Sequence, residues 1–430
     1  MNHSRRPRAS RRARLHSLVL ALDLSSVVGG CTDSGDNGQP APAPQPFVLG
    51  SAISGLTPSE QAAFDRGKRV FEREFKPSEG LGPHYNSISC KSCHSVPTSG
   101  GSARLYRNFY IVRGDSPGQI NLLDLVGPVM PAFGTGSHMS ATFSLTGGRH
   151  VIPTDFFGGP ITVAQRNALP IFGVGLFEFV SNATILANAD PNDLDGDGIS
   201  GRFNTEAGRI GRFGVKSQAN NIESFTRAPL QNQMGITSDP FLGAGAAVSF
   251  AASANAAAQG TASPDAPTSD SDGVPDPEIS AQDLGDLIAF TTFLAPPRKK
   301  PFSLQAMRGD LAFKQLGCVK CHIPSLDSSR GPVEAYTDLL LHDMGDDLMD
   351  NLSFGTPQPG MGTPFTTARE FRTQPLWGVS LTAPFLHDGR AETLDEAIRM
   401  HGGEAAAIRD AYVALTQNER EDIIAFLEHL

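Results

Sequence analysis

Two short cysteine motifs constrain this chain more than any other feature of its sequence. Residues 90–94 read Cys-Lys-Ser-Cys-His, and residues 318–322 read Cys-Val-Lys-Cys-His. Each motif places two thiols about one helical turn apart and an imidazole directly after them. The residues concerned are Cys90, Cys93, His94, Cys318, Cys321 and His322. Four of the five cysteines in the chain therefore belong to one repeated pattern.

Cys-x-x-Cys-His is the pattern by which c-type haem is attached to a protein. The two thiols add across the two vinyl groups of one porphyrin, and the His becomes the proximal ligand of the iron. We therefore predict two covalently bound haem c groups, with His94 and His322 as their proximal ligands. The alternatives are a zinc site shared by the two motifs, a redox-active dithiol and structural disulfides. A zinc site leaves both His residues unexplained, and a dithiol needs no His.

The first 30 residues predict a secretory signal. Residues 1–16 carry six Arg and no acidic residue, and an apolar run follows from Leu15 to Val28. A basic region, a short apolar region and small residues before a cleavage site are typical of such a signal. The apolar run is too short to span a bilayer as a mature helix. The sequence therefore predicts export.

Cys31 follows two glycines, an arrangement that resembles the cleavage box of a bacterial lipoprotein. We predict that this cysteine carries lipid; a plain cleaved signal is the alternative. Residues 31–50 are rich in Pro, Ala, Gly and Ser, which predicts a flexible tether. The mature chain is therefore expected in the periplasm, attached to a bacterial membrane only through its lipid.

Charge and composition exclude several classes of protein. The 430 residues include 35 Lys+Arg and 45 Asp+Glu, which gives a net charge of −10. An acidic chain gives no support to nucleic-acid binding, and five cysteines are too few for a disulfide scaffold. An acidic exported protein suits a small basic partner.

Helix-capping signals occur in both halves of the chain. They begin at Thr57, Ser280, Thr393 and Thr416. An apolar pattern from Phe302 predicts another helix, which runs into the second motif. Residues 96–280 contain many Gly and Asn and few helix signals, which predicts loops, short helices and a few strands.

A helix, a haem motif and a C-terminal docking helix together make a small cytochrome c domain. We therefore predict a mainly α fold with two cytochrome c-like haem domains. Residues 51–297 form the first domain, which carries a large loop-rich insertion, and residues 298–430 form the second.

Several longer motifs resemble those of the bacterial di-haem cytochrome c peroxidase superfamily, over about residues 57–430. They are Gly80-Leu-Gly-Pro, Gly175-Leu-Phe-Glu178, Asp193-Leu-Asp-Gly-Asp-Gly-Ile-Ser-Gly201, Leu341-His-Asp-Met-Gly345, Leu376-Trp-Gly378, and Thr382-Ala-Pro-Phe-Leu-His-Asp-Gly-Arg390 followed by His401-Gly-Gly. Within the superfamily, the chain is most similar to the di-haem oxidoreductase family, whose members are sometimes labelled thiol oxidoreductases. That label has no support here, because haem and lipid account for every cysteine. The pair His84-Tyr85 departs from the family, where we expect more apolar residues.

The resemblance implies a division of labour between two haems. One accepts electrons from a small reduced donor such as a cytochrome c and stays six-coordinate, and the other binds hydrogen peroxide on an open face. Electrons then pass from the C-terminal to the N-terminal haem. Reducing H2O2 to two waters takes two electrons, and two haems can store one each. Superfamily members often form homodimers, which makes a second copy of this chain a candidate partner.

The resemblance also suggests a sixth ligand for the C-terminal haem. The matching position is His401, with Met344 and Met400 as alternatives; Met ligation would raise the potential relative to two His ligands. On the N-terminal haem, His84, His138 and His150 are candidates, but each is better explained as a surface or propionate contact.

Cleavage of peroxide needs a group that moves a proton between the two oxygens. Glu178 is the candidate, because it follows an apolar Gly-rich run where burial could raise its pKa. A structural Glu paired with an Arg is the alternative. Trp377, the only Trp, is a candidate for carrying an electron between the haems or, equally, a core residue.

Two segments are candidates for binding Ca2+. Asp193, Asp195 and Asp197 alternate with Gly, which resembles the start of an EF-hand loop, although position twelve is Asn204. The alternative is a solvated Asp-rich turn. In the superfamily a Thr-x-Pro segment offers backbone carbonyls to an ion between the haems, and Thr382 and Pro384 fit this pattern. A third acidic group, Asp270, Asp272 and Asp276, is interpreted as part of a linker.

These observations favour a di-haem peroxidase. Two alternatives remain open. One is a pure electron carrier with two six-coordinate haems, and the other is an oxidase that acts on a different substrate through high-valent iron.

Overall fold

The computed structural model describes twelve stretches of the chain. They are residues 48–103, 108–113, 129–136, 145–146, 149–150, 155–156, 159–160, 162–206, 209–238, 270, 272–350 and 366–430. The predicted signal, Cys31, all but the last three residues of the predicted tether, and His138 lie outside them. Residues from Phe47 to Leu430 belong to one compact unit.

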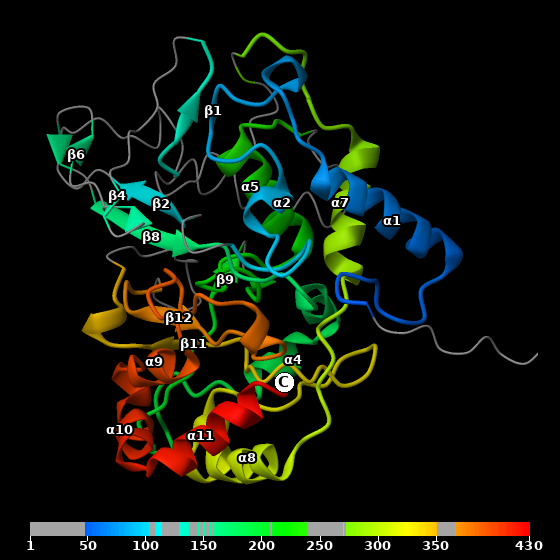
Figure 1. Cartoon of the computed structure of the whole chain (residues 1–430). Coiled ribbons are helices and arrows are strands. Elements are labelled where there is room, and N and C mark those ends of the chain that lie inside the picture. Colours follow the sequence, from blue (N-terminus) through cyan, green and yellow to red (C-terminus); the bar gives the residue numbers. More distant parts are fainter. Residues whose placement is uncertain are drawn as a thin grey trace, which may run out of the picture. The chain divides into compact units, whose positions relative to one another are not determined.

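Helices dominate this unit, which confirms the mainly α prediction (Figure 1). The α-helices are α1 (Pro58–Glu72), α2 (Cys90–Cys93), α4 (Asn182–Leu186), α5 (Ile222–Met234), α7 (Ala281–Phe293), α8 (Leu304–Leu316), α9 (Leu394–Arg399), α10 (Ala406–Ala414) and α11 (Gln417–Leu427). Short 3-10 helices are η1 (Pro77–Glu79), η2 (Val174–Phe179), η3 (Cys318–Lys320), η4 (Asp346–Leu348), η5 (Val379–Leu381) and η6 (Gly403–Ala405). In the part of the chain that is described, no helix is both long and apolar enough to span a membrane.

The strands are short and pair two by two in antiparallel ribbons. They are β1 (His84–Tyr85), β2 (Asn108–Arg113), β3 (Phe133–Gly134), β4 (Leu145–Thr146), β5 (Arg149–His150), β6 (Asp155–Phe156), β7 (Gly159–Pro160), β8 (Thr162–Asn167), β9 (Thr205–Glu206), β10 (Arg209–Ile210), β11 (Leu341–Asp343) and β12 (Glu370–Arg372). The pairs are β1 with β3, β2 with β8, β4 with β5, β6 with β7, β9 with β10 and β11 with β12. Most of them lie within 96–280, as the loop-rich pattern predicts.

The helices begin where the capping signals predict. Thr57, Thr393 and Thr416 each accept a hydrogen bond from the backbone N–H three residues later, and the Glu there bonds back to the cap. Ser280 and Ser303 cap α7 and α8 in the same way, without the returning Glu. Each cap satisfies a backbone donor that the helix itself leaves unpaired.

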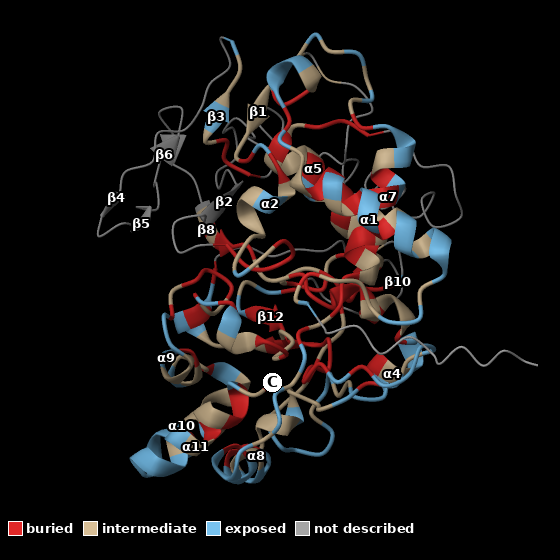
Figure 2. Cartoon of the chain, turned by 45° about the vertical axis from the view of Figure 1, so that its right-hand side comes forward, coloured by how far each residue is buried: buried red, intermediate tan, exposed pale blue. Residues whose placement is uncertain are grey.

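Helices α1 and α7 cross at very close range. A Cβ on Gly67 of α1 would lie only 2.5 Å from the backbone carbonyl carbon of Asp286 and 2.8 Å from Phe290 Cβ, so only Gly fits there. Beside this contact, Arg66 donates two hydrogen bonds of 2.7 Å to the Asp286 carboxylate. Figure 2 shows buried residues where the two helices meet and exposed residues on the outer side of α1.

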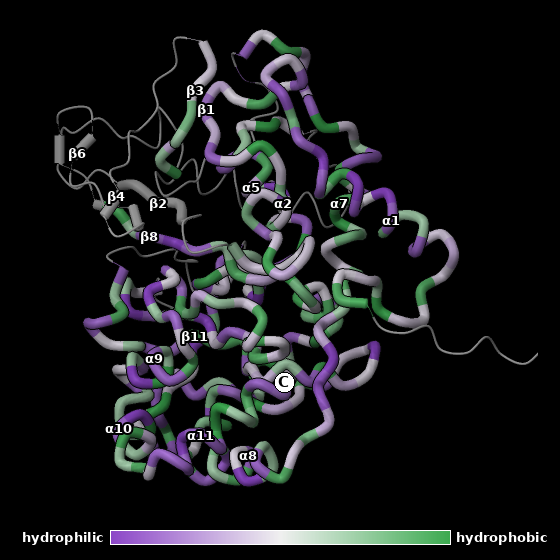
Figure 3. Tube along the Cα trace, viewed as in Figure 1, coloured by the Kyte–Doolittle hydropathy of each residue, from purple (hydrophilic) through white to green (hydrophobic). Residues whose placement is uncertain are grey.

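Helices α8 and α11 repeat the same arrangement. A Cβ on Gly309 would lie 2.5 Å from the carbonyl carbon of Asp422 and 2.8 Å from Phe426 Cβ. Arg308 donates two hydrogen bonds of 2.8 Å to the Asp422 carboxylate. Figure 3 shows hydrophilic and hydrophobic residues interleaved along α1 and α11, as expected for helices with one face in a core and one in water.

The buried apolar residues form two clusters. The larger contains residues of α1, η2, α5 and α7, and the smaller contains residues of α8, α10 and α11. Six residues beyond position 298 pack into the larger cluster: Leu326, Val333, Ala335, Leu339, Leu340 and Trp377. Residues after position 298 therefore contribute to both hydrophobic clusters. The domain boundary between residues 297 and 298 stays a prediction.

Candidate haem-binding sites

The first cysteine motif forms a single helical turn, α2, capped by Ser89. His94 follows directly, and its Nδ1 lies 3.1 Å from the carbonyl oxygen of Gly101. Because a carbonyl only accepts, Nδ1 must carry the proton, which leaves the lone pair on Nε2. The ring lies 6.3 Å from that of Phe71 in α1, and burial lowers the pKa of His94. Holding one ring nitrogen on a carbonyl while the other stays basic is the usual arrangement for a His that ligates a metal.

The second motif begins with a 3-10 turn, η3, which follows Gly317 and has no side-chain cap, but it fixes its His in the same way. His322 Nδ1 lies 3.0 Å from the carbonyl oxygen of Tyr336. The His322 ring lies 6.2 Å from that of Phe313 in α8. Burial lowers the pKa of His322 to about 4, so the imidazole is neutral at physiological pH. Tyr336 holds its carbonyl in place from a left-handed backbone conformation, φ 53°, which is uncommon for a non-Gly residue.

The donor groups fit covalent haem. All four motif cysteines are thiols rather than disulfides. Burial raises the pKa of Cys90 and of Cys318 to about 12. Attachment of haem c to a motif consumes both of its thiols. The two sites would therefore hold the haems through their paired thiols, with His94 and His322 below the irons.

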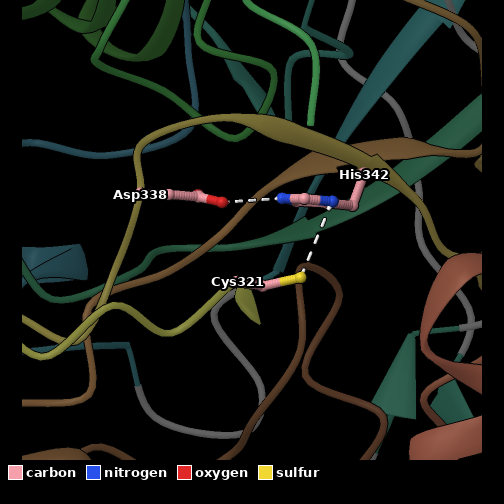
Figure 4. A group of neighbouring side chains, drawn as sticks. All are labelled: Cys321, Asp338 and His342. Atoms are coloured by element: carbon pink, nitrogen blue, oxygen red, sulfur yellow. Dashed lines mark hydrogen bonds and ion pairs between the residues drawn. The ribbon is translucent and has the colours of Figure 1, made fainter. Parts of the chain in front are cut away.

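A buried charged group lies beside the second motif (Figure 4). His342 places Nε2 2.8 Å from Asp338 Oδ2 and Nδ1 2.7 Å from Glu404 Oε2. Its Nδ1 is also 3.6 Å from the Cys321 sulfur, and Figure 4 shows the ring between Asp338 and Cys321. Burial opposes a charge on this ring, but Asp338 and Glu404 hold the pKa of His342 well above its usual value. Both ring nitrogens of His342 thus face protein carboxylates, an arrangement for which the sequence offers no signal.

The candidate sixth ligands lie near this second motif. His401 follows α9, and its Nδ1 lies 2.8 Å from the carbonyl oxygen of Ala397. Its Nε2 is thereby left basic, as in the two proximal His residues. A positive charge on His401 would lower the pKa of His322, as expected for neighbouring rings. The Met344 carbonyl oxygen would lie 2.7 Å from a Cβ on Gly402, the residue that follows His401. The backbones of Met344 and His401 therefore lie close to each other. Met400 caps α9 and is half-buried.

Two of the candidate sixth ligands of the first haem, His84 and His150, lie in short strands. His84 lies in β1, opposite Gly134 of β3. His150 lies in β5, opposite Leu145 of β4. Their assignment as surface or propionate contacts stays a prediction.

Glu178 lies in η2 and accepts a hydrogen bond from the backbone N–H of Ile222 at the start of α5. Burial raises the pKa of Glu178, as predicted, while this hydrogen bond and the charge of Arg212 oppose the rise. Arg212 itself donates to the carbonyl oxygens of Phe177 at 3.1 Å and Val180 at 2.5 Å. The carboxylate thus has a structural contact at a helix N-terminus as well as the raised pKa that proton transfer needs.

The Asp-rich loop gathers a slightly different set from the predicted one. Ligand atoms of Asp190, Asp193 and Asp195 lie within 4.8 Å of one another. Asp197 instead pairs with Lys320 of the second cysteine motif at 2.9 Å. Ser200, at the end of the loop, donates a 2.6 Å hydrogen bond to Glu404. The loop is therefore fastened to the second haem site at two points.

The second calcium candidate contains an unsatisfied buried side chain. Thr382 uses its hydroxyl on the Val379 carbonyl, at 3.1 Å. A Cβ on Gly389 would lie 3.0 Å from Pro384 Cγ and 3.3 Å from Asn167 Cγ, so these two residues line one spot. The Asn167 amide is buried, and neither its oxygen nor its nitrogen has a hydrogen-bond partner among the described residues. An orphaned amide oxygen fits a cation ligand, and the sequence offered no signal for Asn167.

Trp377 is buried in the larger core cluster. It stacks on Phe177 with ring centres 5.5 Å apart and planes 10° apart. The preceding residue, Leu376, packs against the smaller cluster. Trp377 thus packs as a core residue at a point where the two clusters meet, and its electron-transfer role stays a prediction.

Comparison with known proteins relates these sites to a family. A family model described as "Di-haem oxidoreductase, putative peroxidase" matches residues 131–430. The cytochrome-c peroxidase IdrP1 of Denitromonas iodatirespirans is 29% identical over 160 residues, which is 31% of this chain and 42% of that protein. The chain thus spans less than half the length of this curated relative.

Two solved structures are more distant. The diheme peroxidase BthA from Burkholderia thailandensis E264 is 19% identical, covers 88% of this chain and 87% of its own, and has a TM-score of 0.41. A MauG-like protein associated with microbial copper homeostasis is 16% identical, with coverage of 91% and 94% and a TM-score of 0.39. Likeness at this level carries no argument about the fold or activity of this chain. The family model, in contrast, spans well over half of the residues, and the chain therefore belongs to the di-haem oxidoreductase family.

Proposed function

We propose that this protein is a peroxidase that reduces H2O2 to two molecules of water. The reaction takes two electrons and two protons, and a small c-type cytochrome supplies the electrons. The observation that carries the proposal is the pair of matching sites, in which His94 and His322 each keep Nε2 basic beside two thiols. When bound, each haem c supplies an iron that takes up or releases one electron.

The residues around the second site favour it as the point where electrons enter. His401 has its Nδ1 fixed by Ala397 and lies near His322, so it is suited to act as the sixth ligand. A site closed by protein ligands on both faces accepts electrons but leaves no position for peroxide. Peroxide binding then falls to the first site, and electrons pass from the C-terminal to the N-terminal haem.

Glu178 is the proposed proton carrier. Its raised pKa keeps a larger fraction of the carboxyl protonated than for an exposed Glu, which suits a group that both gives and takes a proton. Trp377 is the proposed electron path, because it lies where the two cores meet.

The remaining assignments extend this proposal. Asn167, with the carbonyls of Thr382 and Pro384, would hold one Ca2+, and the Asp193–Asp197 loop is a second candidate. The basic and apolar N-terminus supports export, with a lipid on Cys31 as membrane anchor. A homodimer is the proposed assembly, by analogy with the superfamily.

Electron paramagnetic resonance of the haem-loaded protein tests the proposal. Spectra are taken in the oxidised state, after addition of one electron per molecule, and again after H2O2. A high-spin signal that disappears with peroxide is expected. Two low-spin signals that ignore peroxide in both redox states would leave an electron carrier instead. Reaction with peroxide without turnover of a cytochrome donor would favour the oxidase.

A further inference from the structure

Four acidic residues belong to the short segment that leads into α7. They are Asp270, Asp272, Asp276 and Glu278. Ligand oxygens of Asp270, Asp272 and Glu278 lie within 4.8 Å of one another. No Lys or Arg of the described residues forms an ion pair with any of the four. Like charges at such separations repel strongly away from bulk water, so the cluster needs compensation.

Each of the three converging carboxylates uses one oxygen to hold the backbone. Asp270 Oδ1 accepts a 2.8 Å hydrogen bond from the N–H of Asp272, and Asp272 Oδ1 accepts one of 2.6 Å from Val274. Glu278 Oε2 accepts from the N–H of Thr237. These contacts fix the direction in which each carboxylate points.

The other oxygens of the same side chains are bare. Asp270 Oδ2, Asp272 Oδ2 and Glu278 Oε1 are buried, and none has a hydrogen-bond partner in the described part of the chain. A buried carboxylate oxygen without a partner is costly, and native structures rarely leave one so. Three of them from three residues in one cluster indicate a missing positive ligand rather than three separate defects.

We propose that Asp270, Asp272 and Glu278 bind one Ca2+ through these three bare oxygens. A hard divalent cation suits an all-oxygen donor set, and Ca2+ accepts irregular carboxylate geometry more readily than Mg2+ does. Asp276 supports the site from outside, because its Oδ1 accepts from the Thr237 hydroxyl at 2.6 Å and its Oδ2 from the Asp270 N–H at 3.2 Å.

The site joins three segments. A Cβ on Gly80, in the loop before the first cysteine motif, would lie 2.7 Å from Glu278 Cδ, so this loop packs directly against the site. Thr237 follows α5, and Ser238 pairs with Ile279 in a β-bridge. The ion would thus fasten the end of α5 and the start of α7 beside the loop that leads to the first haem. The inference does not depend on the proposed peroxidase function.

Calcium binding to the haem-loaded full chain tests the site. The protein is stripped with EGTA, and bound Ca2+ is counted by equilibrium dialysis with radioactive calcium in excess Mg2+. We expect the double variant D272N/E278Q, which removes two charges without changing shape, to bind one Ca2+ fewer than the wild type. The matched control is D410N/E421Q on the exposed surface of α10 and α11, which removes the same two charges and should leave the count of bound Ca2+ unchanged. The rise in thermal midpoint that Ca2+ gives through this site should be lost only in the first variant.

Two results would overturn the proposal. One is an unchanged count of Ca2+ in D272N/E278Q, and the other is a wild type that binds no Ca2+ at this site at millimolar concentration. If the double variant loses its haem spectrum or helical circular dichroism, D272N alone is measured. The proposal then requires at least tenfold weaker binding, and equal affinity contradicts it.

Discussion

A methyl group on Gly309 tests how the second haem site is held together. Gly309 brings α8 against α11 so closely that an added Cβ would lie 2.5 Å from the Asp422 carbonyl carbon and 2.8 Å from Phe426 Cβ. Carbon atoms in ordinary contact are about 3.5 to 4 Å apart. The two helices must therefore separate by about 1 Å to accept Gly309→Ala, and the obstacle on the α11 side includes rigid backbone.

The magnitude follows from two opposing effects. Overpacking of a well-packed contact costs about 1 to 3 kcal/mol, and a backbone obstacle places this case at the upper end. Ala in place of Gly inside a helix gains about 1 kcal/mol. We expect a net loss of about 2 kcal/mol in the free energy of unfolding. The separation should also displace Phe313, and with it the packing around His322.

Gly285→Ala is the matched control, because Gly285 lies in α7 with nothing within 4 Å of the added methyl group. This variant should gain about 1 kcal/mol from helix propensity alone. The two variants should therefore differ by about 3 kcal/mol in urea unfolding, followed by circular dichroism and by the haem absorption band. If Gly309→Ala proves as stable as Gly285→Ala, or as the wild type, the close contact does not hold the site and our reasoning is wrong.

Three further predictions concern the second site. His401→Ala should convert one haem from low spin to high spin in the paramagnetic resonance spectrum, whereas Met344→Ala should not; the reverse pattern would assign the ligand to Met344. His342→Gln removes a positive charge beside Cys321. The midpoint potential of one haem, measured by redox titration, should fall by about 50 mV, which is of order 1 kcal/mol. An unchanged potential would count against a charged His342. Burial opposes ionisation of Glu404, but its bonds to His342 and Ser200 lower its pKa to about 2. The stability that Glu404 contributes is therefore complete above about pH 4.3, the ordinary pKa of a Glu, and is lost as the pH falls toward 2. The stability of Glu404→Gln should therefore fall less between about pH 4.3 and 2 than that of the wild type. Identical acid-unfolding curves for the two proteins would refute this role of Glu404.

Local sequence signals predicted much of the fold. The capping residues Thr57, Thr393 and Thr416 act within one turn of the chain, so each helix start is encoded by its own neighbours. The cysteine motifs are equally local. In contrast, the apolar residues Leu304 and Met307 correctly indicate helix α8 but lie exposed on its surface.

One repeat was visible in the sequence but did not enter the prediction. Residues 66–71 read Arg-Gly-Lys-Arg-Val-Phe and residues 308–313 read Arg-Gly-Asp-Leu-Ala-Phe. Residues 286–290 read Asp-Leu-Ile-Ala-Phe and residues 422–426 read Asp-Ile-Ile-Ala-Phe. The Arg, Gly and Asp of these segments form the contacts between α1 and α7 and between α8 and α11. A search for internal similarity therefore finds the helix pair that lies beside each cysteine motif.

The remaining site residues could not be predicted from local pattern. His342 meets Glu404 across 62 positions, and Asn167 comes close to Pro384 from the other half of the chain. Tertiary packing brings these side chains together, and no periodic pattern in the sequence links their positions. The segment that contains Asp270, Asp272 and Asp276 has the composition of a linker, and no local pattern shows in which direction its carboxylate oxygens point.

The two helix crossings also bear on how the holoprotein is assembled. In each, the helix that precedes a cysteine motif is closed by a partner made much later, α7 for the first motif and α11 for the second. As the polypeptide is synthesised from its N-terminus, both pairs of thiols emerge before their closing helices exist. Each crossing is too tight to form loosely, since even one methyl group has no room in it. Each crossing is therefore completed only after the cysteine motif beside it has been synthesised.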